Sequence, residues 1–384
     1  MHLKNKELKT FIDRLNNKED LETVRNDFKK EFESVTTDEI IEAEQALMDD
    51  GMEAEEIQQL CDLHSALMHG MTPMEIHGLP KRVKPWLVEV LEQENKALEH
   101  ILTDLYLNLN YEHAKEVLPK LAALKKHYQK KEELIMPILY DYGITGPATV
   151  MWGVDDEILR DLSRLSKTLT PENFEANRSF LSALLQRMQE MIYKENNILY
   201  DMAMNYFSKE DWLKTYKDAE EFGYAWIDTP EPWQEGEDWA KEHAWVPEDL
   251  TIQLPTGAVD VKQLEKILMM LPIDLTFIDK DDNLKFFTNE GHVFARPKSA
   301  LGRKVYGCHP PRIIAVVEKM LADFKAKRND RVERWVPIPG KPVKVVYQAL
   351  YDENGEYAGT LEMVQSFEEE KDILASLANP KKSA

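Results

Sequence analysis

The sequence predicts a multidomain protein in which N-terminal helices and a four-helix bundle precede an α+β domain. Short blocks of helical periodicity lie before residue 70, four long amphipathic segments follow, and strand-like segments begin after about residue 257. A chain of 384 residues, 43% of them hydrophobic, is long enough for several separate cores. The predicted parts are an N-terminal helical domain (1–77), the bundle (78–207), an acidic linker with tryptophans (208–256), the α+β domain (257–370) and a C-terminal tail (371–384).

The charge and cysteine content restrict the compartment and the partners. The net charge is −22, and most of it lies in the first two thirds of the chain. Such a surface repels phosphate backbones and anionic lipids, so we expect neither nucleic acid nor membrane as a partner. No run reaches the roughly 18 apolar residues of a membrane span, and the charged start "MHLKNKELKTF" does not resemble a signal peptide. Cys61 and Cys308 cannot form a disulfide framework, so the expected location is the cytoplasm.

The helical part begins with short helices. The stretch "TTDEIIEAEQALMDDG" has Thr37 as an N-terminal cap and Gly51 as a stop, and the proline-containing "MTPMEIHGLPKRVKP" is typical of a connector. Four longer apolar-periodic segments follow, separated by turn signals such as "YGITGP" and "LTPENF". Short connections between long helices favour an antiparallel four-helix bundle. The four segments cover about 86–108, 112–141, 152–167 and 172–207.

Within the segment at 208–256, the stretch 218–249 combines many acidic residues with four tryptophans, Trp226, Trp233, Trp239 and Trp245. Acidic residues favour a solvated linker, but large aromatic rings are usually buried against something. We therefore expect this segment to dock on an apolar surface of a neighbouring domain.

The last part of the chain shows strand patterns. "LTFID" and "NLKFF" flank "KDD" as a hairpin, and "PRIIAVVEKMLADFKAK" starts with a proline at a helix start. Three further strands are expected in "RVERWVP", "KPVKVVYQALYD" and "YAGTLEMVQSF". This order of elements is that of a PAS domain.

The chain as a whole resembles bacterial proteins that join domain of unknown function 438, a hemerythrin-like (HHE cation-binding) bundle and a PAS domain. The resemblance is carried by "EEIQQLCDLHSALM", "HYQKKEELIMPIL", "YGITGPATVMWGVDDEI", "MIYKENNILYDMA", "LPIDLTFIDKDDNLKFF" and "GRKVYGCHPPRIIAVVEKMLADF". It implies a bundle that binds iron or another metal and a PAS domain that senses a ligand.

A metal centre in such a bundle needs imidazoles and carboxylates from several helices. In "HYQKKEELIMPIL", His127 and Glu132 are five residues apart, roughly 140° around a helix, so Glu132 would reach the centre from the flank. Hemerythrin-like domains usually have an inward histidine on each of these helices. Here the first helix has Asn95 after Glu94, the third has Asp155 or Asp156, and the fourth has lost the imidazole, with Glu195 as the nearest carboxylate. The set is poor in nitrogen and does not suit a reversible oxygen carrier.

The candidate metal ligands are therefore His127, Glu132, Glu94, Asp155 and Glu195, with His64 of "CDLHSALM" as a possible capping imidazole. Such a shell would suit iron or manganese. The alternative is that His127 is a hydrogen-bonded core histidine and that Cys61 and His64 pack the small N-terminal domain.

The PAS domain offers a second candidate site. Cys308 and His309 stand just before the predicted long helix, near the place where haem-binding PAS domains carry an axial histidine. The alternative is that these residues and the two following prolines fix a tight turn, with the pocket filled by side chains.

The sequence contains no P-loop, nucleophile elbow or dinucleotide fingerprint. We therefore expect no enzyme, but a cytoplasmic sensor or adaptor that reports redox, gas or metal status to an unidentified protein partner. Two alternatives are a di-iron protein acting on oxygen or nitric oxide and a structural interaction protein with vestigial sites.

Overall fold

A computed structural model describes residues 10, 11, 14, 19–32, 83–243, 250–288, 293, 294, 296–338, 341–368 and 370. The chain divides into two compact units, Met1–Ala240 and Lys241–Ala384. His64, Cys61, most of the N-terminal domain and the C-terminal tail lie outside the described residues, so the possible role of His64 stays a prediction.

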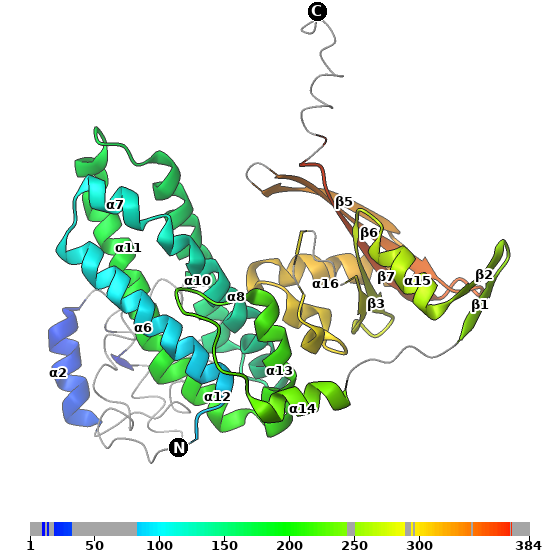
Figure 1. The fold of residues 1–384 in the computed structure, drawn as a ribbon, viewed down its shortest axis with the longest axis horizontal. Helices are drawn as coiled ribbons and strands as arrows, with labels where there is room; N and C mark the ends of the chain where they lie inside the picture. Colours follow the sequence, from blue (N-terminus) through cyan, green and yellow to red (C-terminus); the bar gives the residue numbers. More distant parts are fainter. Residues whose placement is uncertain are drawn as a thin grey trace, which may run out of the picture. The chain divides into compact units, whose positions relative to one another are not determined.

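The described part of the first unit is helical (Figure 1). α2 is capped by Asp20, and its buried Phe28 and Phe32 pack against Phe11. The described α-helices of the first unit are α2 (Leu21–Glu31), α6 (Trp86–Leu107), α7 (Tyr111–Val117), α8 (Leu124–Leu134), α9 (Met136–Asp141), α10 (Gly146–Thr168), α11 (Phe174–Lys194), α12 (Tyr200–Tyr206), α13 (Lys209–Phe222) and α14 (Gln234–Glu242). The last of them, α14, extends two residues past the boundary at Ala240.

The predicted four-helix bundle is confirmed. The first rod is α6 and the third is α10. The second rod is α7, a 3-10 turn at Lys120–Ala123, α8 and α9, with Pro137 in the first turn of α9. The fourth rod is continuous, since α11 passes through the π-helical turn η2 (Glu195–Leu199) into α12.

The segment at 208–256 differs from a plain linker, because α13 packs against α8 and α6 as a fifth helix. A capping box of Ser208 and Asp211 begins this helix. Downstream, the Trp226 indole donates to the Lys120 carbonyl at 2.8 Å, and Trp233 packs edge-on against Tyr216 of α13. The acidic residues of α13 mask its helical pattern in the sequence, but its apolar side chains are buried.

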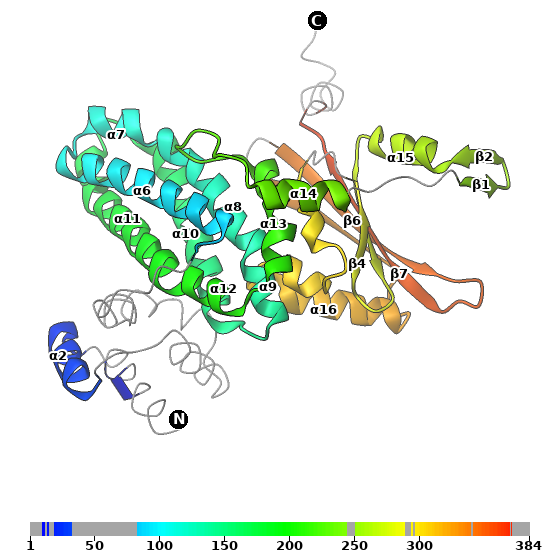
Figure 2. The ribbon, with the colours of Figure 1, turned by 60° about the horizontal axis from the view of Figure 1, so that its bottom comes forward.

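The second unit contains a five-stranded antiparallel sheet of order β4-β3-β7-β6-β5, which Figure 2 shows with α16. This confirms the predicted α+β domain, to which a short hairpin and α15 are added at the start. Its elements are β1 (Thr251–Leu254), β2 (Gly257–Asp260), α15 (Val261–Met269), β3 (Asp274–Asp279), β4 (Leu284–Phe287), α16 (Pro311–Lys325), β5 (Arg331–Ile338), β6 (Lys341–Tyr351) and β7 (Tyr357–Ser366), with 3-10 turns at Lys298–Ala300 and Val305–Cys308.

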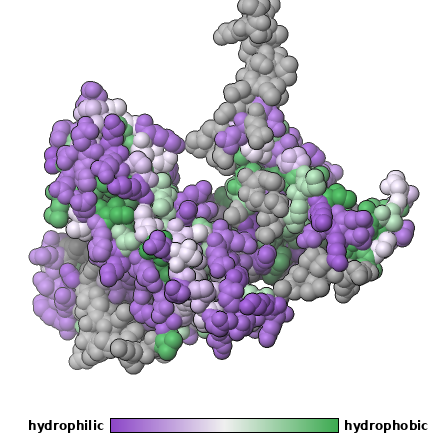
Figure 3. All heavy atoms as spheres, in the orientation of Figure 1, coloured by the Kyte–Doolittle hydropathy of each residue, from purple (hydrophilic) through white to green (hydrophobic). Residues whose placement is uncertain are grey.

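Hydrophilic side chains cover most of the helical part on the face shown in Figure 3. Within the described ranges, no helix is both long and apolar enough to cross a bilayer.

Candidate functional site

The centre of the bundle brings together four of the predicted ligand residues. Glu94 comes from α6, His127 from α8, Asp155 from α10 and Glu195 from η2. Each of the four rods thus contributes one of them. Each of the four residues is at most 1% exposed to solvent. An unpaired charge on any of them would therefore carry a large desolvation cost.

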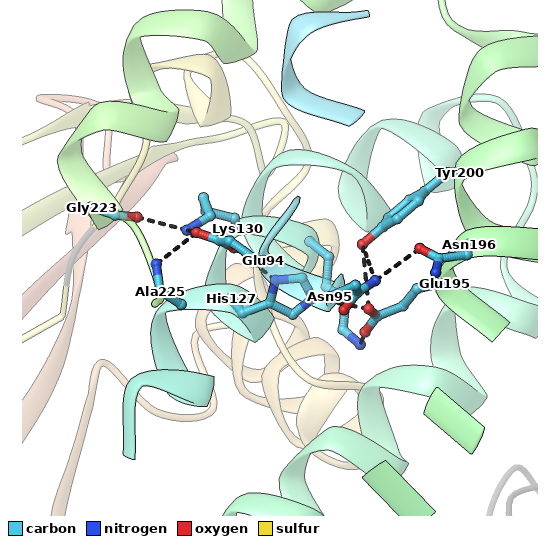
Figure 4. Close-up of polar contacts among 10 residues, drawn as sticks. Glu94, Asn95, His127, Lys130, Glu195, Asn196, Tyr200, Gly223 and Ala225 are labelled. Atoms are coloured by element: carbon cyan, nitrogen blue, oxygen red, sulfur yellow. Dashed lines mark hydrogen bonds and ion pairs between the residues drawn. The ribbon is translucent and has the colours of Figure 1, made fainter. Parts of the chain in front are cut away.

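His127 lies between two carboxylates (Figure 4). Its Nδ1 is 2.7 Å from Glu94 Oε2, and its Nε2 is 2.9 Å from Glu195 Oε2. Burial lowers the pKa of His127, but the charge of Glu195 and the hydrogen bonds to both carboxylates outweigh it and raise that pKa above 6.5. Both ring nitrogens face carboxylate oxygens, which accept hydrogen bonds, so both are engaged within the protein rather than open to a metal.

Two lysines of the same helix reach the same centre, and the sequence analysis missed them. Lys131 Nζ is paired with Asp155 Oδ1 at 2.9 Å and with Glu195, and it lies 4.0 Å from the centroid of the Tyr128 ring. Lys130 Nζ donates to Glu94 Oε1 at 2.8 Å and to the Gly223 carbonyl at 2.6 Å. Both lysines are fully buried.

Helix geometry explains why the lysines point inward. Residues three and four positions apart share one face of an α-helix, so Lys130 and Lys131 follow His127 into the core. Glu132, at the fifth position, falls on the flank. This spacing in "HYQKKEE" is the signal that could have revealed the two lysines. In the fourth rod, the π-helical turn begins at Glu195, and π-helical turns are frequent at functional sites.

The segment after α13 closes one side of the centre. The backbone N–H of Ala225 donates to Glu94 Oε1 at 2.7 Å, beside the contact between Lys130 and Gly223 (Figure 4). Part of the predicted linker therefore belongs to the site.

A smaller set of polar contacts surrounds Glu195. The Tyr200 hydroxyl donates to Glu195 Oε2 at 3.3 Å, and the side-chain amide of Asn95 donates to Tyr200 Oη and to Asn196 Oδ1. Asn95 stands where the family resemblance implies a histidine, and here it serves as a hydrogen-bond donor.

The buried charges balance without an added ion. Burial raises the pKa of Glu195, but Lys131 and His127 outweigh it and lower that pKa to about 2. Burial raises the pKa of Asp155 to about 7, although the charge of Lys131 lowers it. Burial and the charge of Asp155 raise the pKa of Glu132 well above 4.5. The ion pairs at the centre join three cationic side chains to three carboxyl side chains. The cations are His127, Lys130 and Lys131, and the carboxylates are Glu94, Asp155 and Glu195.

These residues do not fit a resident metal ion. Of the oxygens around the centre, Asp155 Oδ2 and Glu132 Oε1 are buried with no hydrogen-bond partner among the described residues. The other carboxylates already have cationic partners. In the part of the chain that the structure describes, no group of three or more His, Cys, Asp or Glu side chains is arranged to hold a metal.

The second predicted site, at Cys308 and His309, lies in the turn before α16. His309 Nδ1 is 2.7 Å from the Val305 carbonyl, and Cys308 Sγ is 4.0 Å from the Lys304 carbonyl. Both contacts stay within the local turn. Between α16 and the sheet, the core includes Leu321 at 1% and Phe324 at 0% exposure. A haem between α16 and the sheet would have to displace this packing, so the described conformation leaves no room for haem there.

The inner face of the sheet carries a polar cluster that the sequence analysis did not identify. Thr276 of β3, Glu362 of β7 and Tyr347 of β6 lie directly opposite one another across the three strands. Arg296 from the preceding loop pairs with Glu362 at 2.5 Å. Burial and the Glu362 carboxylate raise the pKa of Tyr347. Thr276 Oγ1 is buried and has no hydrogen-bond partner among the described residues.

Comparison with known proteins gives three family matches along the chain. Residues 8–73 match a family of unknown function (DUF438), residues 87–203 match the hemerythrin HHE cation binding domain, and residues 264–368 match a PAS domain. These matches confirm the combination that the sequence resemblance indicated.

Two solved structures are similar to parts of the chain. One is a C-terminal domain from Streptococcus mutans, with 31% identity over 33% of this chain and 98% of that chain and a TM-score of 0.31. The other is a sensory box sensor histidine kinase from Vibrio cholerae, with 12% identity over 27% of this chain and 87% of that chain and a TM-score of 0.22. No curated protein matches the chain.

Proposed function

We propose that this chain, which joins a DUF438 region, a hemerythrin-family bundle and a PAS domain, is a non-enzymatic sensor or adaptor of the cytoplasm. In this proposal the PAS domain receives the input, and the output is contact with a protein partner. The bundle serves as a metal-independent scaffold, since its buried carboxylates already have partners within the protein.

The observation that carries the proposal is the unsatisfied hydroxyl of Thr276 in the polar cluster of the PAS sheet. A buried polar group without a partner costs about 1–3 kcal/mol, and a ligand that supplies the missing hydrogen bond recovers this cost. The adjacent Arg296–Glu362 pair offers one cation and one carboxylate to the same ligand. We therefore infer that the input is a small polar molecule with both a donor and an acceptor, rather than a metal or a gas.

The experiment compares the full-length protein with Thr276→Val, which removes the hydroxyl and keeps the side-chain shape. Melting is followed by intrinsic fluorescence in the presence of small carboxylic acids, amides and amino acids, tested singly. A compound of this class should raise the melting temperature of the wild type and not that of Thr276→Val, because only the folded wild type binds it.

A serine substitution provides the matched control. Thr276→Ser keeps the hydroxyl and should keep the response to the same compound. If no compound of this class distinguishes the wild type from Thr276→Val, the proposed input site is wrong.

The two alternatives from the sequence receive less support. A di-iron protein acting on oxygen or nitric oxide requires free nitrogen and oxygen donors, and these are engaged in the centre of the bundle. A haem sensor requires space between α16 and the sheet, which side chains such as Leu321 and Phe324 fill.

A further inference from the structure

The centre of the bundle contains a cation of its own at the point where carboxylates of two rods converge. Asp155 from α10 and Glu195 from η2 both pair with Lys131 Nζ. Lys131 is fully buried. A metal ion bound between the two rods would meet the same two side chains.

We propose that the ammonium group of Lys131 takes the place of a divalent cation in this bundle, and that removing this side chain opens a metal site of carboxylates and one imidazole. The inference concerns the bundle alone and does not depend on the proposed input at the PAS domain.

Two unpaired oxygens give independent support. Asp155 Oδ2 and Glu132 Oε1 are buried and have no hydrogen-bond partner among the described residues. A lysine offers only three donors on one nitrogen, whereas a divalent ion accepts ligands from several directions. Asp155 Oδ2, on the side chain that pairs with Lys131, is therefore left over when an ammonium group replaces an ion, and it becomes available as a ligand when a divalent ion enters.

Charge supports the same assignment. Three cations face three carboxylates in the wild type. Removing Lys131 leaves one negative charge in excess and frees one oxygen each of Asp155 and Glu195. His127 Nε2 lies 2.9 Å from Glu195 Oε2 and is the one imidazole nitrogen beside these freed oxygens. A set with mainly oxygen donors and one imidazole suits Mn²⁺, Fe²⁺ or Co²⁺.

The test uses Co²⁺, whose visible absorption reports coordination, with the full-length protein. Wild type and Lys131→Ala are dialysed against Co²⁺ in a non-chelating buffer and then analysed for metal, visible absorption and melting temperature. Lys131→Ala should retain a stoichiometric amount of Co²⁺ and melt at a higher temperature with Co²⁺ than without it. The wild type should retain only background metal.

Three further variants separate the site from general effects. Lys125→Ala removes an exposed lysine of the same helix and should behave as the wild type. Lys131→Met removes the charge but fills the space, so it should not gain Co²⁺. In the Lys131→Ala background, His127→Ala should lose the visible absorption band.

Two results would overturn the proposal. One is a folded Lys131→Ala protein that retains no more Co²⁺ than the wild type. The other is stoichiometric Co²⁺ in the wild type that is lost in His127→Ala.

The wild type alone gives a second measurement that does not need a folded variant. In protein labelled with ¹⁵N-histidine, the ring-nitrogen signals of His127 should be unchanged by Co²⁺. Paramagnetic broadening of these signals would show that the ion reaches the centre despite Lys131, which contradicts the proposal.

Discussion

Replacing Asp155 by Asn should change how the stability of the bundle depends on pH. Burial raises the pKa of Asp155 from 3.8 to about 7, although Lys131 opposes this shift. The folded state therefore holds the proton more tightly than the unfolded chain, and stability falls as the pH rises from about 4 to about 7. The shift corresponds to about 4 kcal/mol for complete ionisation. Asn has the same shape, accepts a hydrogen bond from Lys131 and does not ionise.

The assay is urea unfolding followed by helical circular dichroism, at several pH values between about 4 and 8. The free energy of unfolding of Asp155→Asn minus that of the wild type should rise through this window by about 4 kcal/mol and then level off. Asp161→Asn, on the same helix but outside the buried network, is the matched control. A difference between Asp155→Asn and wild type that stays constant with pH would refute the reasoning.

Three further predictions follow from the described contacts. The pKa of Glu195 is about 2 in the folded state against 4.5 in the unfolded chain, so its ionised form contributes about 3 kcal/mol of stability above pH 4.5, which is lost towards pH 2. In urea titrations, the difference in free energy of unfolding between wild type and Glu195→Gln should therefore shrink below pH 4.5. Limited proteolysis of the full-length protein should spare residues 218–243, because Trp226 and Trp233 are docked, and early cleavage there by mass spectrometry would contradict this docking. Hemin should give the same Soret band with wild type and His309→Ala, and a band that depends on His309 would show that the core beside α16 opens.

The sequence predicts the elements of the fold well where long segments keep one period. The predicted helix at 86–108 corresponds to α6 (Trp86–Leu107), and the strands around "DENG" correspond to β6 and β7. α13 does not stand out in the sequence, because its many acidic residues indicate a linker. The signal was present at Ser208 and Asp211, which form a capping box, and in the apolar spacing of Trp212 and Tyr216.

The predicted site residues meet in space, but their chemistry depends on neighbours that a ligand search overlooks. His127 and the inward carboxylates stand out in the sequence because imidazoles and carboxylates are metal ligands. Lys130 and Lys131 do not stand out, because lysine is rarely fully buried and its protonated amine is not a metal ligand. The contribution of the Ala225 backbone to Glu94 could not be predicted from the sequence, because it depends on how a distant segment returns to the bundle.

The arrangement of charges suggests why a bundle without a fitting metal site keeps a polar centre. A buried ion pair adds little net stability compared with apolar packing, but breaking one costs about 3–5 kcal/mol. Here the carboxylates come from three rods and the cations from the remaining one, so no rod can rotate or slide without leaving a charge unpaired. We infer that the network selects one register of the four rods over others. Lys131 is central to this selection, because its ammonium group, carried by α8, pairs with Asp155 of α10 and with Glu195 of η2 at the same time.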